Sequence, residues 1–302
     1  GGGNQNPYRV SGGLHGVGLS VVNALSQRLD VAVRRGDGRV HRQSFARGAA
    51  LGPVEASRDA GASKRRGTEV RFTPDATVFK PGAAMDPAAL EQRLRELAFL
   101  NSGTTVRWRC LDGDAPQEGQ QPGGEGADGE EEPGTPWTVH RYEDGLRQYV
   151  AWMAANTTLL HPAPFHFEGQ HSEEGASTPI TVSVALQWSQ DTYSDTVVTF
   201  ANSVRTVDGG AHLDGFKAAL TRTLNALARR HKVLKDGDRN LPGDHLREGL
   251  HAAVSVRVPE PEFEGQTKAR LGNARGVRKA VEAVVADRLG RLMDAHPEAL
   301  AA

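Results

Sequence analysis

A glycine-rich stretch near the start of the chain places the strongest constraint on its fold. Four glycines fall within seven residues, and an apolar run with helical spacing follows them: Gly12, Gly13, Gly16 and Gly18. Glycines let the backbone adopt positive φ angles and approach a ligand closely. The N-terminus of a helix that begins directly afterwards presents unpaired N–H groups and a partial positive charge at the same place. The stretch therefore predicts an anion site, in the simplest case a site for phosphate.

The spacing of the glycines also leaves a tight loop with a glycine cap as an alternative. Two nucleotide-binding motifs are excluded by the residues present. The stretch lacks the G-x-x-x-x-G-K-[ST] pattern of a Walker A loop, and no G-x-G-x-x-G fingerprint follows a strand.

Composition bounds the class of protein. The chain has 302 residues, which suffices for two domains of ordinary size. A formal net charge of −1 gives no global attraction to nucleic acid, so any contact with DNA needs a local basic patch. The single cysteine, Cys110, excludes an intramolecular disulfide framework and a cysteine-cluster metal site. No apolar run of about 18 residues is present, so we expect no membrane span. Because the first residue is glycine and no signal or transit segment follows, we expect a piece of a longer protein.

Local patterns predict a strand and a helix in the first part of the chain. Val70 and Phe72 alternate with polar residues, which predicts a half-buried strand that begins near Thr68. Asp86 followed by Pro87 is typical of a helix start, with aspartate as the N-cap and proline at the first helical position.

A stretch of different composition separates two patterned regions. Residues 111–136 hold eight acidic residues, no basic ones, and many glycines and prolines. Such a stretch has too little apolar surface to order itself, so we interpret it as a disordered acidic insertion in a linker. A role as a DNA mimic or a self-inhibitory segment is the alternative. The predicted organisation is a first domain over 1–110, the insertion over 111–136 and a second domain over 137–302.

The second region contains two predicted strands and a long basic helix. Strands over 180–188 and 196–201 are joined by a short polar link, and a parallel crossover would need a dozen or more residues, so we predict an antiparallel pair. The helix that follows Asp208 and its neighbours carries five basic residues: Lys217, Arg222, Arg229, Arg230 and Lys232. These side chains form either a solvated face or a surface that contacts DNA phosphates.

A second glycine-bracketed loop presents chemistry suited to phosphate. Gly265 and Gly272 bracket a loop that carries Gln266 and Lys268, and a last helix is predicted over 277–296. A lysine ammonium can stabilise the charge that develops on a transferring phosphoryl group. Taken alone, the loop could equally carry an ordinary exposed lysine.

Both glycine loops resemble motifs of the DNA gyrase B family, as do the Gly67-Thr68 pair and the segment 202–217. The resemblance covers nearly the whole chain apart from the acidic insertion. It implies an α+β fold: the C-terminal part of a GHKL (Bergerat) ATPase sandwich, followed by a ribosomal-protein-S5-like transducer domain with a long C-terminal helix. Topoisomerase IV, Hsp90, MutL and the histidine kinases share this ATPase fold.

The resemblance also assigns roles to residues. It implies that ATP is contacted by Tyr8, Gly13, Leu14, His15, Gly16, Val17, Gly18, Thr68, Gln266 and Lys268. His15 is alternatively an ordinary residue of the ATP lid. The Thr68 hydroxyl would help to bind adenine. Lys268 and Gln266 are the catalytic candidates, because the family's lysine reaches the γ-phosphate from the second domain. Domain orientation would then sense the γ-phosphate. Lys217 and Arg222 are the candidate DNA contacts.

The implied function is that of the ATPase subunit of a type II DNA topoisomerase, which couples ATP hydrolysis to strand passage and negative supercoiling. The implied partners are double-stranded DNA, the gyrase A protein in a heterotetramer of two A and two B proteins, and a second gyrase B protein when ATP binds; no membrane is involved. A topoisomerase IV counterpart and a non-enzymatic remnant that binds DNA or dimerises are the alternatives.

Some family features are missing or changed. The family's general-base glutamate, its magnesium-binding asparagine and its adenine-reading aspartate precede the lid, and no replacement for them is found in this sequence. We therefore expect this chain alone to be inactive, and the ligand for Mg²⁺ to lie outside it. Ala211 stands where the family usually has threonine. The expected location is the cytoplasm of a bacterium, or a chloroplast or mitochondrion of an alga or plant.

Overall fold

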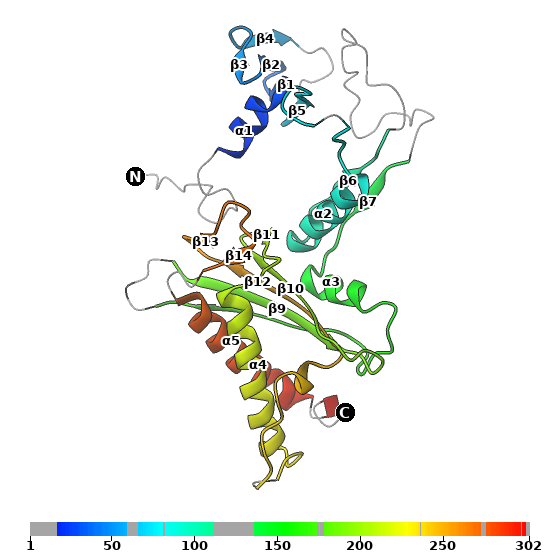
Figure 1. Ribbon diagram of the computed structural model, residues 1–302, viewed down its shortest axis with the longest axis vertical. Helices are drawn as coiled ribbons and strands as arrows, with labels where there is room; N and C mark the ends of the chain where they lie inside the picture. Colours follow the sequence, from blue (N-terminus) through cyan, green and yellow to red (C-terminus); the bar gives the residue numbers. More distant parts are fainter. Residues whose placement is uncertain are drawn as a thin grey trace. The chain divides into compact units, whose positions relative to one another are not determined.

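The structure is a computed structural model, and it describes residues 17–58, 66–80, 82–111, 136–173, 175, 178–235, 237–272, 276–296 and 298–299 (Figure 1). Contacts between residues divide the chain into a smaller unit, Gly13–Met85, and a larger unit that holds Asp86–Ala302. In the described ranges no helix is long and apolar enough to cross a membrane.

The smaller unit is an antiparallel sheet with a short helix. Its elements are α1 (Gly18–Ala24), β1 (Ser26–Arg35), β2 (Arg39–Ala46), β3 (Ala49–Ala50), β4 (Glu55–Arg58) and β5 (Arg66–Pro74). The strand order is β3-β2-β1-β5, and β4 also pairs with β2. The predicted strand is therefore present as β5, at one edge of the sheet.

The β5 side chains are more exposed than the sequence pattern predicts. Val70 and Phe72 are each 41% exposed. The one helix among the described residues of this unit is α1, and its main contacts are with β1 and β2. The apolar side chains of β5 consequently receive little cover.

The larger unit is built on a mixed sheet. Its helices are α2 (Pro87–Leu100), α3 (Leu146–Met153), α4 (Ala211–Arg230) and α5 (Val277–Ala295), and the described residues also include a 3₁₀ turn, η1 (His245–Arg247). Its strands are β6 (Val106–Trp108), β7 (Thr138–His140), β8 (Phe165–His171), β9 (Ile180–Trp188), β10 (Thr196–Ala201), β11 (Val204–Arg205), β12 (Leu250–Arg257), β13 (Phe263–Glu264) and β14 (Arg270–Leu271). The main sheet has the order β11-β10-β12-β9-β8. The last helix was predicted over 277–296, and α5 confirms it.

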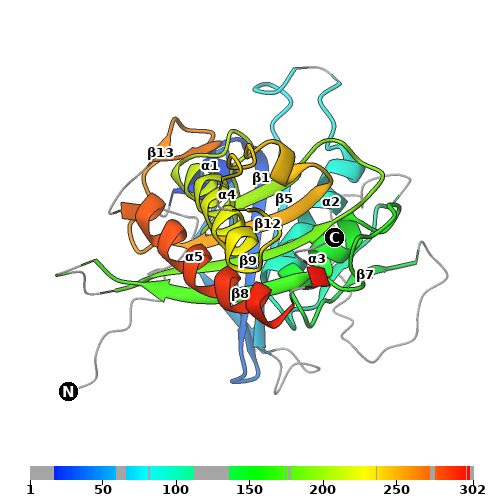
Figure 2. The same cartoon turned by 90° about the horizontal axis from the view of Figure 1, so that it is seen from below.

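Helices cover both faces of this sheet. Alternate side chains of β9 and β12, such as Val184 and Val254, enter the main core with α4 and α5. Ala185 and Ala253 point to the opposite face and pack in a smaller core with α3 and Phe99 of α2. Figures 1 and 2 show α4 and α5 together on one side of the sheet and α3 on the other.

The predicted pairing of strands 180–188 and 196–201 is wrong. β12 lies between β9 and β10: Val198 of β10 is opposite Ala253 in a parallel pair, and Ala253 is opposite Ala185 of β9 in an antiparallel pair. The two strands run in opposite directions, as the short link requires, but they are not neighbours. β12 is buried at nearly every position, which suits a strand in the middle of the sheet.

The helix start at Asp86 is confirmed. Asp86 Oδ1 accepts hydrogen bonds from the backbone N–H groups of Ala88 at 2.9 Å and Ala89 at 3.2 Å. α2 packs on α3, and the buried carboxylate of Glu96 forms an ion pair with Arg205 of β11. These contacts group residues 86–111 with the larger unit, whereas the sequence placed a boundary at residue 110. The division into domains over 1–110 and 137–302 stays a prediction.

Candidate functional site

Gln266 and Lys268 lie in the loop of a short hairpin. Its strands β13 and β14 pair at two positions, Phe263 with Leu271 and Glu264 with Arg270. Lys268 has a φ of +55°. A residue other than glycine in this left-handed region costs of the order of 1 kcal/mol and persists only where its surroundings impose it. The candidate catalytic lysine is thus held in a defined, strained conformation.

The turn before α4 is bound to this hairpin by backbone hydrogen bonds. The Asp208 N–H donates to the Ala269 carbonyl at 2.9 Å, and the Leu271 N–H donates to the Gly209 carbonyl at 3.0 Å. A Cβ on Gly210 would lie 2.1 Å from the Leu271 carbonyl oxygen, so the two backbones meet more closely than any side chain allows. The segment 208–212, which resembles a gyrase B motif, therefore supports the lysine loop.

The buried side chain of His212 stabilises the same turn. Its side chain is fully buried, and its Nε2 lies 2.9 Å from Thr206 Oγ1, which in turn lies 2.6 Å from Thr199 Oγ1. Burial lowers the pKa of His212 to about 4, and the positive charge of Arg270 acts in the same direction. The imidazole is therefore neutral at pH 7. Ala211, in the place of the family's threonine, packs its methyl group in the main core.

We expect His212 to make the larger unit less stable in mild acid. The pKa of histidine is ordinarily 6.5 and falls to about 4 at this site, so the unfolded chain binds the proton first as the pH falls. The stability that the neutral imidazole provides is complete above pH 6.5 and is lost between about pH 6.5 and pH 4, by about 3 kcal/mol in total. Urea unfolding across this range measures the loss. A His212→Gln variant should lack this part of the pH dependence, and the same slope in both proteins would contradict the assignment.

The structure describes only the end of the first glycine-rich stretch. Five predicted ATP contacts lie outside the described residues: Tyr8, Gly13, Leu14, His15 and Gly16. Val17 is the N-cap of α1 and Gly18 is its first residue, and no side chain caps the helix. Within the part of the chain that the structure describes, no atom lies within 4 Å of where a Cβ of Gly18 would be.

Thr68 lies near the start of β5, where the sequence predicted it. It is exposed and stands opposite Val33 of β1. Among the described residues, no atom lies within 4 Å of where a Cβ of the neighbouring Gly67 would be. Thr68 shares the smaller unit with Val17 and Gly18, whereas Gln266 and Lys268 belong to the larger unit.

The candidate DNA contacts on α4 are paired with carboxylates. Lys217 Nζ lies 3.4 Å from Asp195 Oδ2, and Arg222 Nη2 lies 2.7 Å from Glu282 Oε2. Of the other basic residues, Arg230 pairs with Asp294 at 2.8 Å. The carboxylates of these pairs are partly buried, whereas Arg222 is largely exposed. The sequence showed the basic residues but not these partners, which come from distant segments.

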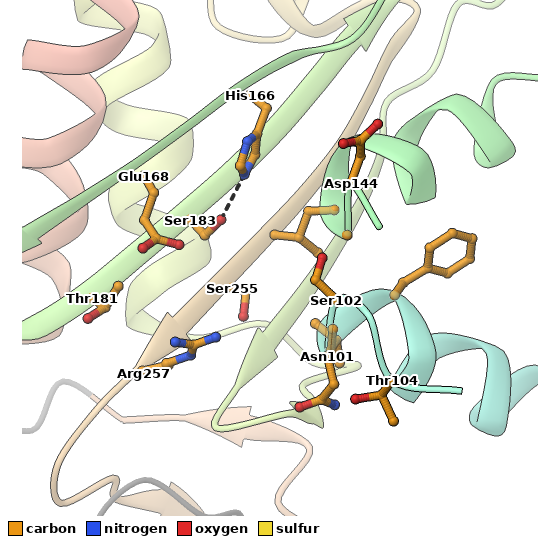
Figure 3. Close-up of a pocket in the computed structure, with 14 residues that line it drawn as sticks. Asn101, Ser102, Thr104, Asp144, His166, Glu168, Thr181, Ser183, Ser255 and Arg257 are labelled. Carbon is orange, nitrogen blue, oxygen red and sulfur yellow. Dashed lines mark hydrogen bonds between the residues drawn. The ribbon is translucent and has the colours of Figure 1, made fainter. Parts of the chain in front are cut away.

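Sequence reasoning missed a polar pocket on the larger unit. Its volume is about 420 Å³, and it lies where polar side chains of β8, β9 and β12 face α2 and the start of α3 (Figure 3). His166 Nε2 lies 3.1 Å from Ser183 Oγ on its floor, and Glu168 and Arg257 line it as well. Its 14 lining residues include none of the predicted ATP or DNA contacts. The ranges that the structure describes hold no cluster of three or more His, Cys, Asp or Glu side chains that could bind a metal ion.

Comparisons with known proteins identify the family. The family model for DNA gyrase B matches residues 145–302. The DNA gyrase B protein of Synechocystis sp. is 44% identical over 290 residues, which are 96% of this chain and 24% of that protein. The chain belongs to the DNA gyrase B family.

Further relatives support the same conclusion. The mitochondrial DNA gyrase B protein of Arabidopsis thaliana is 43% identical over 300 residues, 99% of this chain and 37% of that protein. A crystal structure of the 43K ATPase domain of Thermus thermophilus gyrase B has a TM-score of 0.72 and 32% identity, over 95% of this chain and 69% of that domain. This chain thus spans 24% of the length of the Synechocystis relative and 37% of that of the Arabidopsis relative.

The matches confirm the predicted resemblance and the α+β class of the GHKL ATPase fold. A topoisomerase IV ATP-binding domain from Francisella tularensis matches at 23% identity, which shows the shared fold alone. The gyrase B interpretation is therefore favoured over topoisomerase IV.

Proposed function

We propose that this chain is part of the ATP-hydrolysing B protein of a DNA gyrase and couples ATP binding and hydrolysis to DNA strand passage and negative supercoiling. The observation that carries the proposal is the loop of Gln266 and Lys268. A lysine is held there at a φ of +55°, on a hairpin whose backbone is bonded to the start of α4. Strain that the surroundings impose on one residue is typical of functional sites.

The proposed ATP contacts come from two parts of the sequence. Val17, Gly18 and the residues before them would surround the phosphates with backbone N–H groups, and no atom of the described residues fills the Cβ side of Gly18. Thr68 would donate or accept a hydrogen bond at adenine. Lys268 would stabilise negative charge on the γ-phosphate, and Gln266 would orient the same group.

Magnesium would neutralise phosphate charge when bound with ATP. We propose, from the family resemblance, that the protein ligand of the metal lies outside this chain. The role of Lys268 needs only its own ammonium group and the position of its loop.

The proposed macromolecular partners are DNA, the gyrase A protein and a second gyrase B protein. Lys217 and Arg222 would contact DNA phosphates after exchanging Asp195 and Glu282 for phosphate oxygens, so this contact should weaken steeply with salt. Because plant relatives are named chloroplastic or mitochondrial, we propose an organelle location if the chain comes from a plant or an alga. In a bacterium the location would be the cytoplasm.

Calorimetric titration with a non-hydrolysable ATP analogue and Mg²⁺ tests the proposed site. The titration compares this chain with a longer polypeptide that also carries the remaining part of the ATPase domain. We expect clear binding by the longer polypeptide, and we expect Thr68→Ala to weaken it about tenfold through the lost hydrogen bond.

Thr73→Ala is the matched control for this titration. Thr73 is also exposed on β5, but it stands an odd number of residues from Thr68 and so points to the opposite face of the sheet. The control should bind the analogue like the unchanged polypeptide. Equal weakening by both substitutions would remove Thr68 from the site, and no binding by the longer polypeptide would refute the proposed function.

A further inference from the structure

We infer that Arg270 is a positioning residue that holds the Lys268 loop against the first turn of α4. The inference rests on the proposed function of Lys268 and adds to it the device that fixes where the lysine stands. It follows from the contacts of the hairpin with the rest of the larger unit.

The hairpin is too small to hold the loop by itself. β13 and β14 contribute two residues each, and a further backbone hydrogen bond, from the Gly272 N–H to the Glu262 carbonyl at 2.8 Å, closes the base. Isolated two-stranded hairpins are marginally stable in water. The position of Lys268 must therefore be set by contacts outside the hairpin.

One arginine supplies two such contacts and a third within the hairpin. Arg270 Nη1 donates to the Asp208 carbonyl at 3.0 Å, and its Nη2 lies 3.7 Å from Asp214 Oδ2 in the first turn of α4. Its Nε lies 3.3 Å from Glu264 Oε1, on the opposite strand of the hairpin. The guanidinium group thus joins the hairpin, the turn before α4 and α4 itself. A planar group with several fixed donors suits this role better than a single ammonium.

The contacts of Arg270 set the position of Lys268 because the two residues are close in the chain. Arg270 is two residues after Lys268, so both side chains leave the same short segment of backbone. On the far side of Arg270, Leu271 is 1% exposed and anchors β14 in the main core. The segment is therefore held in the core at Leu271 and at the surface by Arg270, and Lys268 lies just beyond these two anchors in the loop. A reacting group that shifts by about 1 Å can lose a large part of its effect on the rate.

The first test measures hydrogen exchange in this chain and needs no ATP. The amides of Asp208 and Leu271 bond across the joint between hairpin and turn, whereas the amide of Gly272 bonds within the hairpin. We expect Arg270→Gln to speed exchange at Asp208 and Leu271 about tenfold and to leave Gly272 nearly unchanged. Arg270→Lys should restore part of the protection.

Arg291→Gln is the matched control, because Arg291 is an exposed arginine that pairs with Asp287 within α5. It should change none of the three amides. Unchanged exchange at Asp208 and Leu271 in Arg270→Gln would overturn the inference. A uniform rise at all amides would overturn it as well, because it would make the role of Arg270 one of general stability.

The second test separates the inference from the proposed function. In the full-length gyrase B protein, Arg270→Gln should lower kcat about tenfold with KM for ATP and affinity for ADP nearly unchanged, and Arg270→Lys should recover part of the loss. If Lys268→Ala leaves ATP hydrolysis intact, the proposed function fails. If Lys268→Ala removes hydrolysis and Arg270→Gln behaves like Arg291→Gln, the inference alone fails.

Discussion

Replacing Lys268 by alanine in the full-length gyrase B protein is expected to lower ATP turnover at least about 100-fold and to leave ADP binding nearly intact. The ammonium would act on charge that develops at the γ-phosphate, and ADP lacks this group. Alanine at φ +55° carries the same backbone strain as lysine, so the substitution removes the amine and keeps the backbone strain. Steady-state hydrolysis and calorimetric titration with ADP measure the two effects.

Lys279→Ala provides the control for this substitution. Lys279 is an exposed lysine on α5, so its loss changes the net charge by the same amount without touching the loop. Its turnover should stay close to that of the unchanged protein. If ADP affinity in Lys268→Ala fell as far as turnover, the lysine would serve the nucleotide as a whole, and its assignment to the γ-phosphate would be wrong.

The parts of the fold that could be predicted are those that local chemistry determines. The Asp86-Pro87 pair gave the start of α2, because an aspartate N-cap and a proline at the first helical position act within one turn. The lysine loop could be predicted to be a loop because glycines bracket it. The relative direction of β9 and β10 could also be predicted, since the seven residues that join them are too few for a parallel crossover.

The parts that could not be predicted depend on segments far apart in the sequence. β12 follows β10 by about 50 residues and still enters the sheet between β9 and β10, and no local pattern encodes that order. Glu96 of α2 is buried because Arg205 reaches it from β11, which draws α2 into the larger unit. The carboxylates that pair with Lys217 and Arg222 likewise come from other segments, so the sequence overstated the free positive charge of α4.

The contacts that hold the Lys268 loop could be predicted only in part. The sequence singled out the segment 208–212 by resemblance, and it singled out Lys268 by resemblance and chemistry. It gave no indication that the two are joined. The joint exists because two backbones approach each other at Gly210 and Leu271, and such a contact leaves no trace in hydrophobic periodicity.

Gly210→Ala is expected to destabilise the larger unit by about 3 kcal/mol or more. Gly210 has a φ of +130°, and a Cβ would lie 2.1 Å from the Leu271 carbonyl oxygen and 2.6 Å from its nitrogen. Both obstacles are backbone atoms of a residue that is anchored in the core, so they cannot move aside as a flexible side chain would. Urea unfolding measures the loss, and hydrogen exchange at Leu271 reports whether the joint opens.

Gly290→Ala is the control of opposite sign. Gly290 lies within α5, and apart from the helix's own backbone no atom of the described residues lies within 4 Å of where its Cβ would be. Alanine there should stabilise the unit by about 0.5–1 kcal/mol, because glycine loses more conformational freedom in a helix. If Gly210→Ala were as harmless as Gly290→Ala, the close approach of the two backbones would be absent. Arg270 alone would then hold the Lys268 loop against α4, and Arg270→Gln should free the loop completely from this position. If Gly210→Ala instead breaks the contact between the turn before α4 and the hairpin, it should lower turnover in the full-length protein as Arg270→Gln does. Both changes would release the short piece of backbone between Leu271 and Lys268.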